Sequence, residues 1–350
     1  MDKDTLVDLV KSGELIAGLD LSGKDLSGAD LSGGIFEKTS FAGAKLEGAS
    51  LRESVFSGCD FSGVTGAEAN LRHVTFQACT GRSADFSKAN AQTSRFLECN
   101  FAAAKLDGAD LLAVAFAKCE LPMISLAGAN MDRTQFVETS VDGATFTGAM
   151  MKHTVLLGCD LRKANLRGTK LDTVVLVKAN LAGLDLSDMD LELCQFMDGN
   201  LEGALLCGAN LTQCNFKGTN LRGAKLDGAM APKAMFANAS LERSSFHKAK
   251  CREALFFEAI APGVDFSGAD LSMCVFLRAK CEGARFENAD LTYADLSHAD
   301  VSRADFSGAT LHRARMHRTK EDGAKFGFNR AAAFNTDDDI AQAEEWRAPS

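Results

Sequence analysis

Large apolar residues recur at every fifth position of this chain, from Leu21 to Phe326, with no insertion or deletion. Of these 62 central positions, 54 hold Leu, Phe, Met or Val. The residue two positions earlier is usually small, and Asn or Asp often stands between, as in Ala209-Asn210-Leu211. Because side chains alternate across a strand, the small and central residues are predicted to point inward and the Asn or Asp outward. The remaining two residues, often Ser-Gly or Lys-Gly, suit a turn, so each unit is predicted to be a short strand and a corner.

Phenylalanine shows how many units make one circuit. Phe recurs every 20 residues from Phe36 to Phe136 and again from Phe196 to Phe276, and Cys59, Cys79, Cys99 and Cys119 have the same period. Four units per circuit predict a square coil. We name its faces by their central residues: the first face (Phe41, Phe61), the second (Leu26, Leu46), the third (Leu31, Leu51) and the fourth (Phe36, Phe56).

Packing volume supports this assignment. The small centres Gly81 and Ala91 have phenylalanines as neighbours in the repeat, and small centres later in the chain also coincide with phenylalanines on the other faces. Since protein interiors are close-packed, a small residue on one face must be offset by a large one on another. The pattern therefore favours an interior that is filled coil by coil.

With this repeat, the chain resembles the pentapeptide-repeat proteins, whose unit is commonly written A(D/N)LXX. The resemblance implies an all-β fold, a right-handed quadrilateral β-helix solenoid of about 15 turns with short N- and C-terminal capping helices. We expect residues 1–14 to form an N-terminal capping helix, residues 15–330 the β-helix, and residues 331–350 a C-terminal tail with a short helix. The family is broad, so the resemblance does not by itself define a function.

Both ends depart from the repeat. Thr5-Leu6-Val7-Asp8 resembles a capping box, and Gly13 is a natural helix stop, so a short helix is expected to cover the open first turn. Thr336-Asp337-Asp338-Asp339 is expected to open a second helix that caps the last turn. Solenoids need such caps because an open end exposes strand edges and core.

The composition is typical of a soluble protein, and we expect the protein to be bacterial and cytoplasmic. No apolar run approaches the roughly 18 residues of a membrane helix, and the N-terminal residues lack the features of a signal peptide, so we expect neither membrane insertion nor export by that route. Ten of the 11 cysteines occupy inward positions and are interpreted as reduced core residues, whereas Cys207 is predicted to face solvent.

No catalytic or cofactor-binding constellation is apparent, so we expect no enzyme activity, no cofactor and no metal. The six histidines all follow central positions closely, and none has the helical spacing of a zinc motif. The nearest grouping, His298, His312 and His317, is interpreted as solvent-facing. No phosphate-binding loop of the Gly-x-x-x-x-Gly-Lys-Ser/Thr type occurs.

The outward side of the fourth face breaks the polar rule, and this is the candidate functional surface. We call the outward apolar residues on this side the fourth-face stripe. An exposed apolar surface of this length usually marks an interaction site. The alternatives are incidental β-favouring residues on a sheet surface, or coverage by the chain's own tail. The stripe consists of Val137, Val155, Leu157, Val175, Val177, Met197, Met235, Leu255, Phe257, Val275 and Leu277.

Two functional classes compete. The first is a non-enzymatic scaffold or adaptor that docks a protein partner, or its own twin as a homodimer, through the fourth-face stripe, without binding nucleic acid directly. The second is suggested by resemblance to the gyrase-protecting pentapeptide-repeat proteins, which are acidic rods that mimic DNA and protect DNA gyrase from quinolones. The net charge of −9 permits mimicry. A mimic needs a continuous acidic track, because DNA carries one charge per about 1.7 Å of duplex axis. Here Asp290, Asp295, Asp300 and Asp305 form a belt instead.

The segment from Leu15 to Gly23, after its short helix, also looks like the start of pentapeptide-repeat modules found in bacterial type VI secretion clusters. Such modules are thought to act as adaptors near the secreted spike. This resemblance implies a specialised form of the scaffold function.

Overall fold

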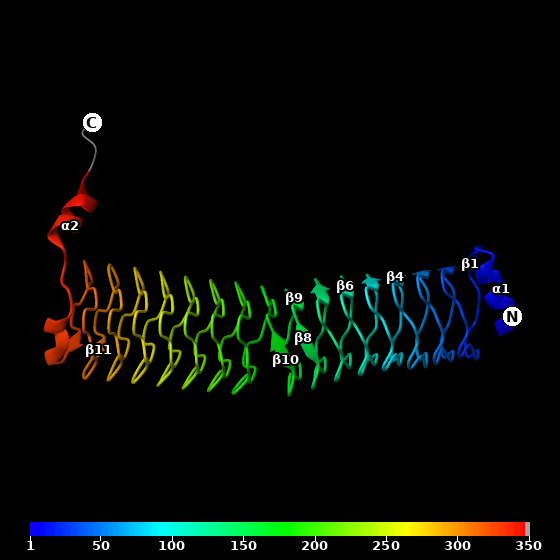
Figure 1. Cartoon of the computed structure of the whole chain (residues 1–350), viewed down its shortest axis with the longest axis horizontal. Helices are drawn as coiled ribbons and strands as arrows, with labels where there is room; N and C mark the ends of the chain where they lie inside the picture. Colours follow the sequence, from blue (N-terminus) through cyan, green and yellow to red (C-terminus); the bar gives the residue numbers. More distant parts are fainter. Residues whose placement is uncertain (347–350) are drawn as a thin grey trace. The chain divides into compact units, whose positions relative to one another are not determined.

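The computed structural model describes residues 1–346, which divide into two compact units, Met1–Asn180 and the residues from Leu181 onward (Figure 1). Each unit is a stack of square β-helical coils, and the whole chain forms about 16 turns. The predicted all-β, right-handed quadrilateral β-helix is confirmed.

The first unit contains helix α1 (Lys3–Lys11) and ten short strands. Eight of these strands pair in parallel along the fourth face, in the order β1-β2-β3-β4-β5-β6-β7-β9, and β8 pairs with β10 on the third face. The strands are β1 (Leu15–Ala17), β2 (Ile35–Glu37), β3 (Val55–Ser57), β4 (Thr75–Gln77), β5 (Arg95–Leu97), β6 (Ala115–Ala117), β7 (Gln135–Val137), β8 (Met150–Lys152), β9 (Val155–Leu157) and β10 (Lys170–Asp172).

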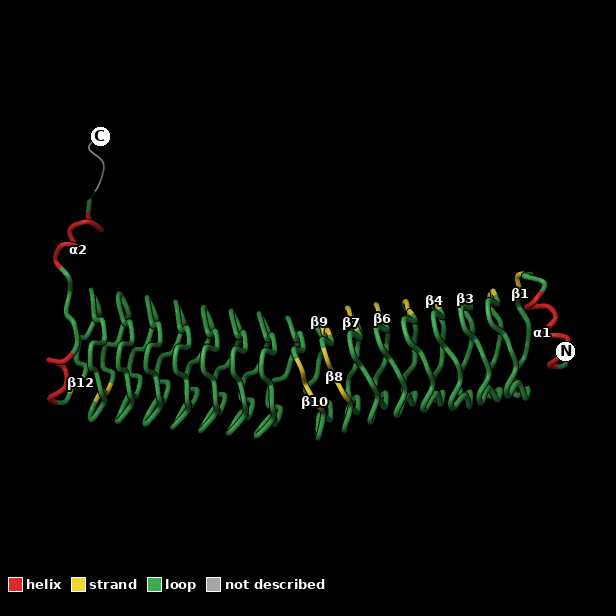
Figure 2. Tube along the Cα trace, in the orientation of Figure 1, coloured by secondary structure: helices red, strands yellow, loops and turns green. Residues whose placement is uncertain are grey.

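The second unit contains strands β11 (Asp305–Phe306) and β12 (Lys325–Phe326), the 3-10 helix η1 (Phe328–Ala332) and helix α2 (Asp338–Glu345). Most of its coils are joined by single parallel bridges between residues 20 apart, such as Leu255 with Val275, so Figure 2 shows them as loops. The same offset holds in the first unit, where Phe36 lies opposite Phe56. The predicted circuit of four pentads is therefore confirmed.

The corners explain the residue preferences of the repeat. The second residue after each centre has a positive φ in most pentads, for example 61° at Gly58 and 61° at Glu53, and glycine adopts this conformation at least cost. The Asn or Asp before the centre often accepts a hydrogen bond from the backbone N–H two residues later, as Asp60 does from Ser62 at 2.9 Å. These outward Asn and Asp side chains thus stabilise the turns.

The inward positions form the predicted core. Fourth-face phenylalanines stack coil on coil, with ring centroids 4.9 Å apart for both Phe36–Phe56 and Phe116–Phe136. In the second unit the Phe256–Phe276 pair is 4.6 Å apart. The small centres are offset as predicted, because Phe101 leans over Gly81 and Phe86 over Gly66. These contacts show that the interior is filled coil by coil, as the sequence predicts.

The cysteines lie where the sequence predicts. Ten are buried, and Cys207 alone is half-exposed. Burial raises the pKa of the Cys159 thiol to about 12 and that of Cys281 to about 12. Because the thiolate is the reactive form, these buried thiols are protonated and unreactive at neutral pH.

Because the other ten cysteines are buried and closed to the reagent, alkylation of the native protein with iodoacetamide at neutral pH should modify Cys207 alone. In denaturant all 11 cysteines should react. Peptide mass spectrometry would locate the labels, and Cys207→Ser is the control that should abolish native labelling. Rapid native labelling of any cysteine at an inward position would contradict the assigned register.

Helix α1 covers the first coil. Leu6 and Val10 are buried, and Lys3 Nζ donates a hydrogen bond to the Ser27 carbonyl at 2.6 Å. The predicted start at Thr5 is wrong by a few residues, because Asp2 is the N-cap and its carboxylate accepts the Thr5 N–H at 2.9 Å. An Asp side chain at this place satisfies a free N–H of the first turn, so the helix begins at Lys3.

The C-terminal end is closed by η1 and the residues after it. Arg330 lies over the Phe326 ring at 5.5 Å and forms an ion pair with Glu321 at 2.7 Å. Ala333 is buried, and Phe334 forms a parallel bridge with Arg315. Helix α2 has no buried residue and contacts the side of the last coils through Glu344 and Glu345, rather than covering their open end. The segment at the start of the predicted tail, rather than α2, therefore covers the last coil.

Candidate functional site

In the first unit, the fourth-face stripe begins at β7 and β9, the last two strands of the eight-stranded sheet, and continues into the next coil. Val137 ends β7 and lies opposite Leu157 of β9. Val155 begins β9 and bridges to Val175 in the following coil. All five stripe residues of this unit, Val137, Val155, Leu157, Val175 and Val177, are half-buried. They occupy matching outward positions in three successive coils.

In the second unit, Met235, Leu255 and Val275 lie in successive parallel bridges. Phe257 and Leu277 occupy the matching positions one residue after the centre. These five residues and Met197 are also half-buried. Each unit thus presents an apolar strip that runs from coil to coil along its own fourth face.

A second apolar group on the fourth face was not predicted from the sequence. Leu15, Ile35 and Val55 begin β1, β2 and β3 and lie opposite one another. These three side chains are 57%, 47% and 39% exposed, and each is more exposed than any residue of the stripe. They occupy the same position before the centre as Val155 and Val175, so the signal was present in the sequence.

Within residues 331–346, the tail lies beside the stripe at Leu277, the last residue of the stripe. Helix α2 and the residues before it enclose a cavity of about 560 Å³ against the last coils. Leu277 is the stripe residue that lines this cavity, together with Phe334 and Ile340 of the tail. Ile340 and Trp346 remain 51% and 71% exposed, so α2 leaves its apolar side chains largely open to solvent.

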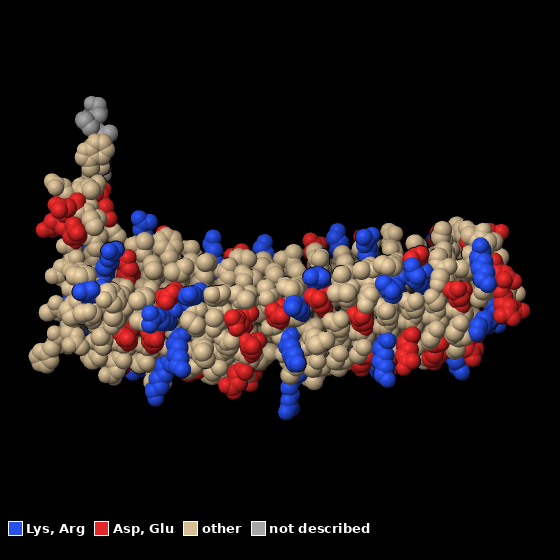
Figure 3. Space-filling model, viewed as in Figure 1, with Lys and Arg blue, Asp and Glu red and all other residues tan. Residues whose placement is uncertain are grey.

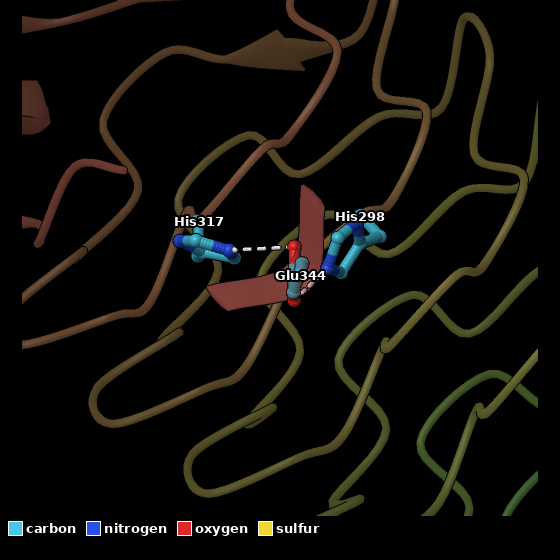
Figure 4. A group of neighbouring side chains, drawn as sticks. All are labelled: His298, His317 and Glu344. Atoms are coloured by element: carbon cyan, nitrogen blue, oxygen red, sulfur yellow. Dashed lines mark hydrogen bonds and ion pairs between the residues drawn. The ribbon is translucent and has the colours of Figure 1, made fainter. Parts of the chain in front are cut away.

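A polar cluster holds α2 against the coils. Glu344 of α2 lies between two histidines of the fourth face, with Oε1 3.1 Å from His298 Nε2 and Oε2 3.4 Å from His317 Nε2 (Figure 4). Arg318 Nε lies 3.3 Å from the same carboxylate. Desolvation raises the pKa of the Glu344 carboxyl, but hydrogen bonds from His298 and His317 outweigh it and lower the pKa below its ordinary value.

The histidine grouping differs from the sequence interpretation. His317 is buried at 8% exposure, so its interpretation as solvent-facing is wrong, because α2 covers it. His298 and His317 lie with ring centroids 5.3 Å apart, whereas His312 packs against Tyr293 at 5.9 Å. The contribution of Glu344 could not be foreseen, because the tail has no repeat that fixes its position.

The acidic belt of the last coils is partly neutralised. Asp300 pairs with Lys320 at 3.1 Å, and Asp305 with Lys325 at 3.4 Å, each lysine standing one coil further on. Figure 3 shows basic and acidic side chains interspersed over the visible face. Neither observation provides the continuous acidic track that a DNA mimic requires.

Neither α-helix within residues 1–346 is long and apolar enough to cross a bilayer. Comparison with known families identifies the repeat directly. A family model described as "Pentapeptide repeat region" matches residues 29–106, and one described as "Pentapeptide repeats" matches eight copies, most of them overlapping, between residues 142 and 320. The chain belongs to the pentapeptide-repeat family. A search of curated proteins finds no match.

Solved structures of the same fold are only distantly similar. A trypsin-treated form of QnrB1, a plasmid-mediated fluoroquinolone resistance protein, is 20% identical over 51% of this chain and 89% of its own, with a TM-score of 0.43. HetL, which is involved in heterocyst differentiation regulation in the cyanobacterium Nostoc sp. strain PCC 7120, is 19% identical over 90% of this chain and 97% of its own, with a TM-score of 0.24. At these identities the likeness concerns the fold alone.

Proposed function

We propose that this protein is a non-enzymatic scaffold or adaptor that docks another protein, or a second copy of itself, through the fourth-face stripe. The observation that carries the proposal is the register of the stripe. Apolar residues recur at the same outward positions in successive coils, interrupted once at Asn215 and Lys217, where the repeat otherwise places polar ones. The partly exposed Val, Leu, Met and Phe side chains offer apolar area to a partner. Covering this area contributes about 25 cal/mol per Å² to the free energy of binding, before the costs of association are subtracted.

The resemblance of the segment from Leu15 to Gly23 to type VI secretion modules supports a specialised form of this function, an adaptor in such a cluster. It rests on analogy of fold and sequence alone. Leu15 is the first residue of this segment, and Ile35 and Val55 lie opposite it in the next two coils. These exposed residues form a second apolar surface that an adaptor could use.

The alternative function is an acidic DNA mimic that binds DNA gyrase and protects it from quinolones. The net charge of −9 permits this function, whereas the ion pairs of Asp300 with Lys320 and of Asp305 with Lys325 argue against it. A gyrase supercoiling assay with a quinolone distinguishes the two functions. Relief of inhibition at stoichiometric protein would favour the mimic over the scaffold.

The stripe is tested by the combined variant Leu157→Lys, Val177→Lys and Phe257→Lys. These side chains point outward, so we expect the free energy of unfolding to change by roughly 1.5 kcal/mol or less in total. The variant should lose self-association, measured as mass by size-exclusion chromatography with light scattering, or lose the partners that wild-type protein retains from cells of its source.

The matched control carries Met150→Lys, Leu205→Lys and Met230→Lys, which change isolated apolar residues on other faces that are 49%, 39% and 45% exposed. It adds the same charge without touching the stripe, so its mass and partners should match those of the wild type. If the stripe variant is folded and indistinguishable from this control, the stripe is ordinary surface and the scaffold proposal fails.

A further inference from the structure

We propose that His298, His317 and Glu344 bind a zinc ion that fastens α2 to the fourth face. They are the one group of three potential metal ligands found among residues 1–346, and their ligand atoms lie within 4.8 Å of one another. Two imidazoles and one carboxylate form a ligand set that zinc accepts, and three protein ligands leave a fourth position open. This inference is independent of the scaffold proposal.

The distances already approach those of a metal site. Zinc binds imidazole nitrogen and carboxylate oxygen at about 2.0–2.2 Å, which in a tetrahedron places neighbouring ligand atoms roughly 3.3 Å apart. Glu344 oxygens lie 3.1 Å from His298 Nε2 and 3.4 Å from His317 Nε2. The three ligand atoms are spread over up to 4.8 Å, so the histidine rings as well as Glu344 would have to turn toward the ion.

The surroundings favour a cation. Asp295, Asp337 and Glu344 line the cavity beside the cluster, against one lining cation, Arg315. An excess of carboxylates attracts positive ions. The open fourth position would face this cavity of about 560 Å³, where a water molecule or another small ligand could complete the coordination.

Arg318 does not need Glu344 to balance its charge. Its guanidinium also donates to Glu345 Oε1 at 2.5 Å and to the Ala341 carbonyl at 2.8 Å. Glu344 can therefore turn from Arg318 to a metal ion without leaving the arginine unpaired. Both glutamates lie near the end of α2, so the helix would remain held at this point.

One hydrogen bond must be exchanged for the metal. The Asp337 backbone N–H donates to Nδ1 of His317 at 3.1 Å, so without a metal the neutral ring carries its proton on Nε2, toward Glu344. When Nε2 binds zinc, this proton moves to Nδ1 and the Asp337 N–H must turn away. Because Asp337 is the N-cap of α2, zinc would reshape the start of the helix as well as fasten its end.

The test titrates the untagged, chelator-treated full chain with Zn²⁺ by isothermal calorimetry and with Co²⁺ by visible absorption. Trp346, the only tryptophan, lies two residues from Glu344, so its fluorescence reports on the same site. We expect one ion per chain, a tetrahedral Co²⁺ spectrum and a change in Trp346 emission. Glu344→Gln and His298→Ala should weaken binding at least about 100-fold, since even residues that only support the ligands contribute 10–100-fold.

The matched control is His312→Ala, which removes a nearby histidine outside the cluster and should bind like the wild type. Because His298 and His312 are at outward positions of the repeat and Glu344 is in α2, all three variants should retain the wild-type circular dichroism. The proposal is overturned if the wild type binds no stoichiometric zinc, or if Glu344→Gln and His298→Ala bind as tightly as His312→Ala.

Discussion

Replacing Leu111 by Asp is expected to unfold coils of the first unit. Leu111 is a third-face centre with no exposed surface, and the centres above and below it, Ala91 and Met131, are equally buried. The variant loses the burial of a leucine and introduces a charge with no partner in the core, so we expect a loss of more than about 4 kcal/mol. In a solenoid each coil is stabilised mainly by its neighbours, so the disruption should spread to adjacent coils.

Leu112→Asp is the matched control, because it makes the same substitution one residue further on, at a half-buried outward position. Thermal unfolding followed by circular dichroism should show a large decrease in Tm for Leu111→Asp and a small one for Leu112→Asp. If the two variants melt at similar temperatures, the assignment of inward and outward positions is incorrect.

Residues with the five-residue period could be placed from the sequence because the coil is closed and uninterrupted. Without insertions, each residue must lie above the one 20 positions earlier, so the phenylalanine period fixed the register that the pairing of Phe36 with Phe56 confirms. The same geometry correctly placed Cys207 outward and Cys159 inward. Strict repetition makes distant contacts predictable from local spacing.

The candidate sites were less predictable. The positions of Val155 and Val275 on one face follow from the repeat, but what covers that face does not. His298 and His317 lie 19 residues apart, close to one coil, and this was a usable signal. Glu344 belongs to a tail whose position depends on contacts specific to this chain, so the cluster appears only in the structure.

Gly81→Leu should destabilise the first unit even though Leu is the commonest residue at central positions. A Cβ at Gly81 would collide with the Phe101 ring, which lies over the glycine from the next coil of the first face. The φ of Gly81 lies outside the left-handed region, so the expected penalty is steric. Forcing a larger side chain into such a packed core costs about 1–3 kcal/mol, and more where neighbours cannot move.

A second substitution separates overpacking from a general intolerance of this coil. Gly81→Leu combined with Phe101→Val carries the same number of side-chain carbon atoms as the native pair, so the core volume is nearly restored. Phe101→Val alone should be destabilising because it leaves a cavity. In guanidinium unfolding, the double variant should be more stable than the sum of the two single effects predicts, by about 1 kcal/mol or more. Additive effects would mean that Gly81 and Phe101 do not share one packing space, and that the interior is not filled coil by coil.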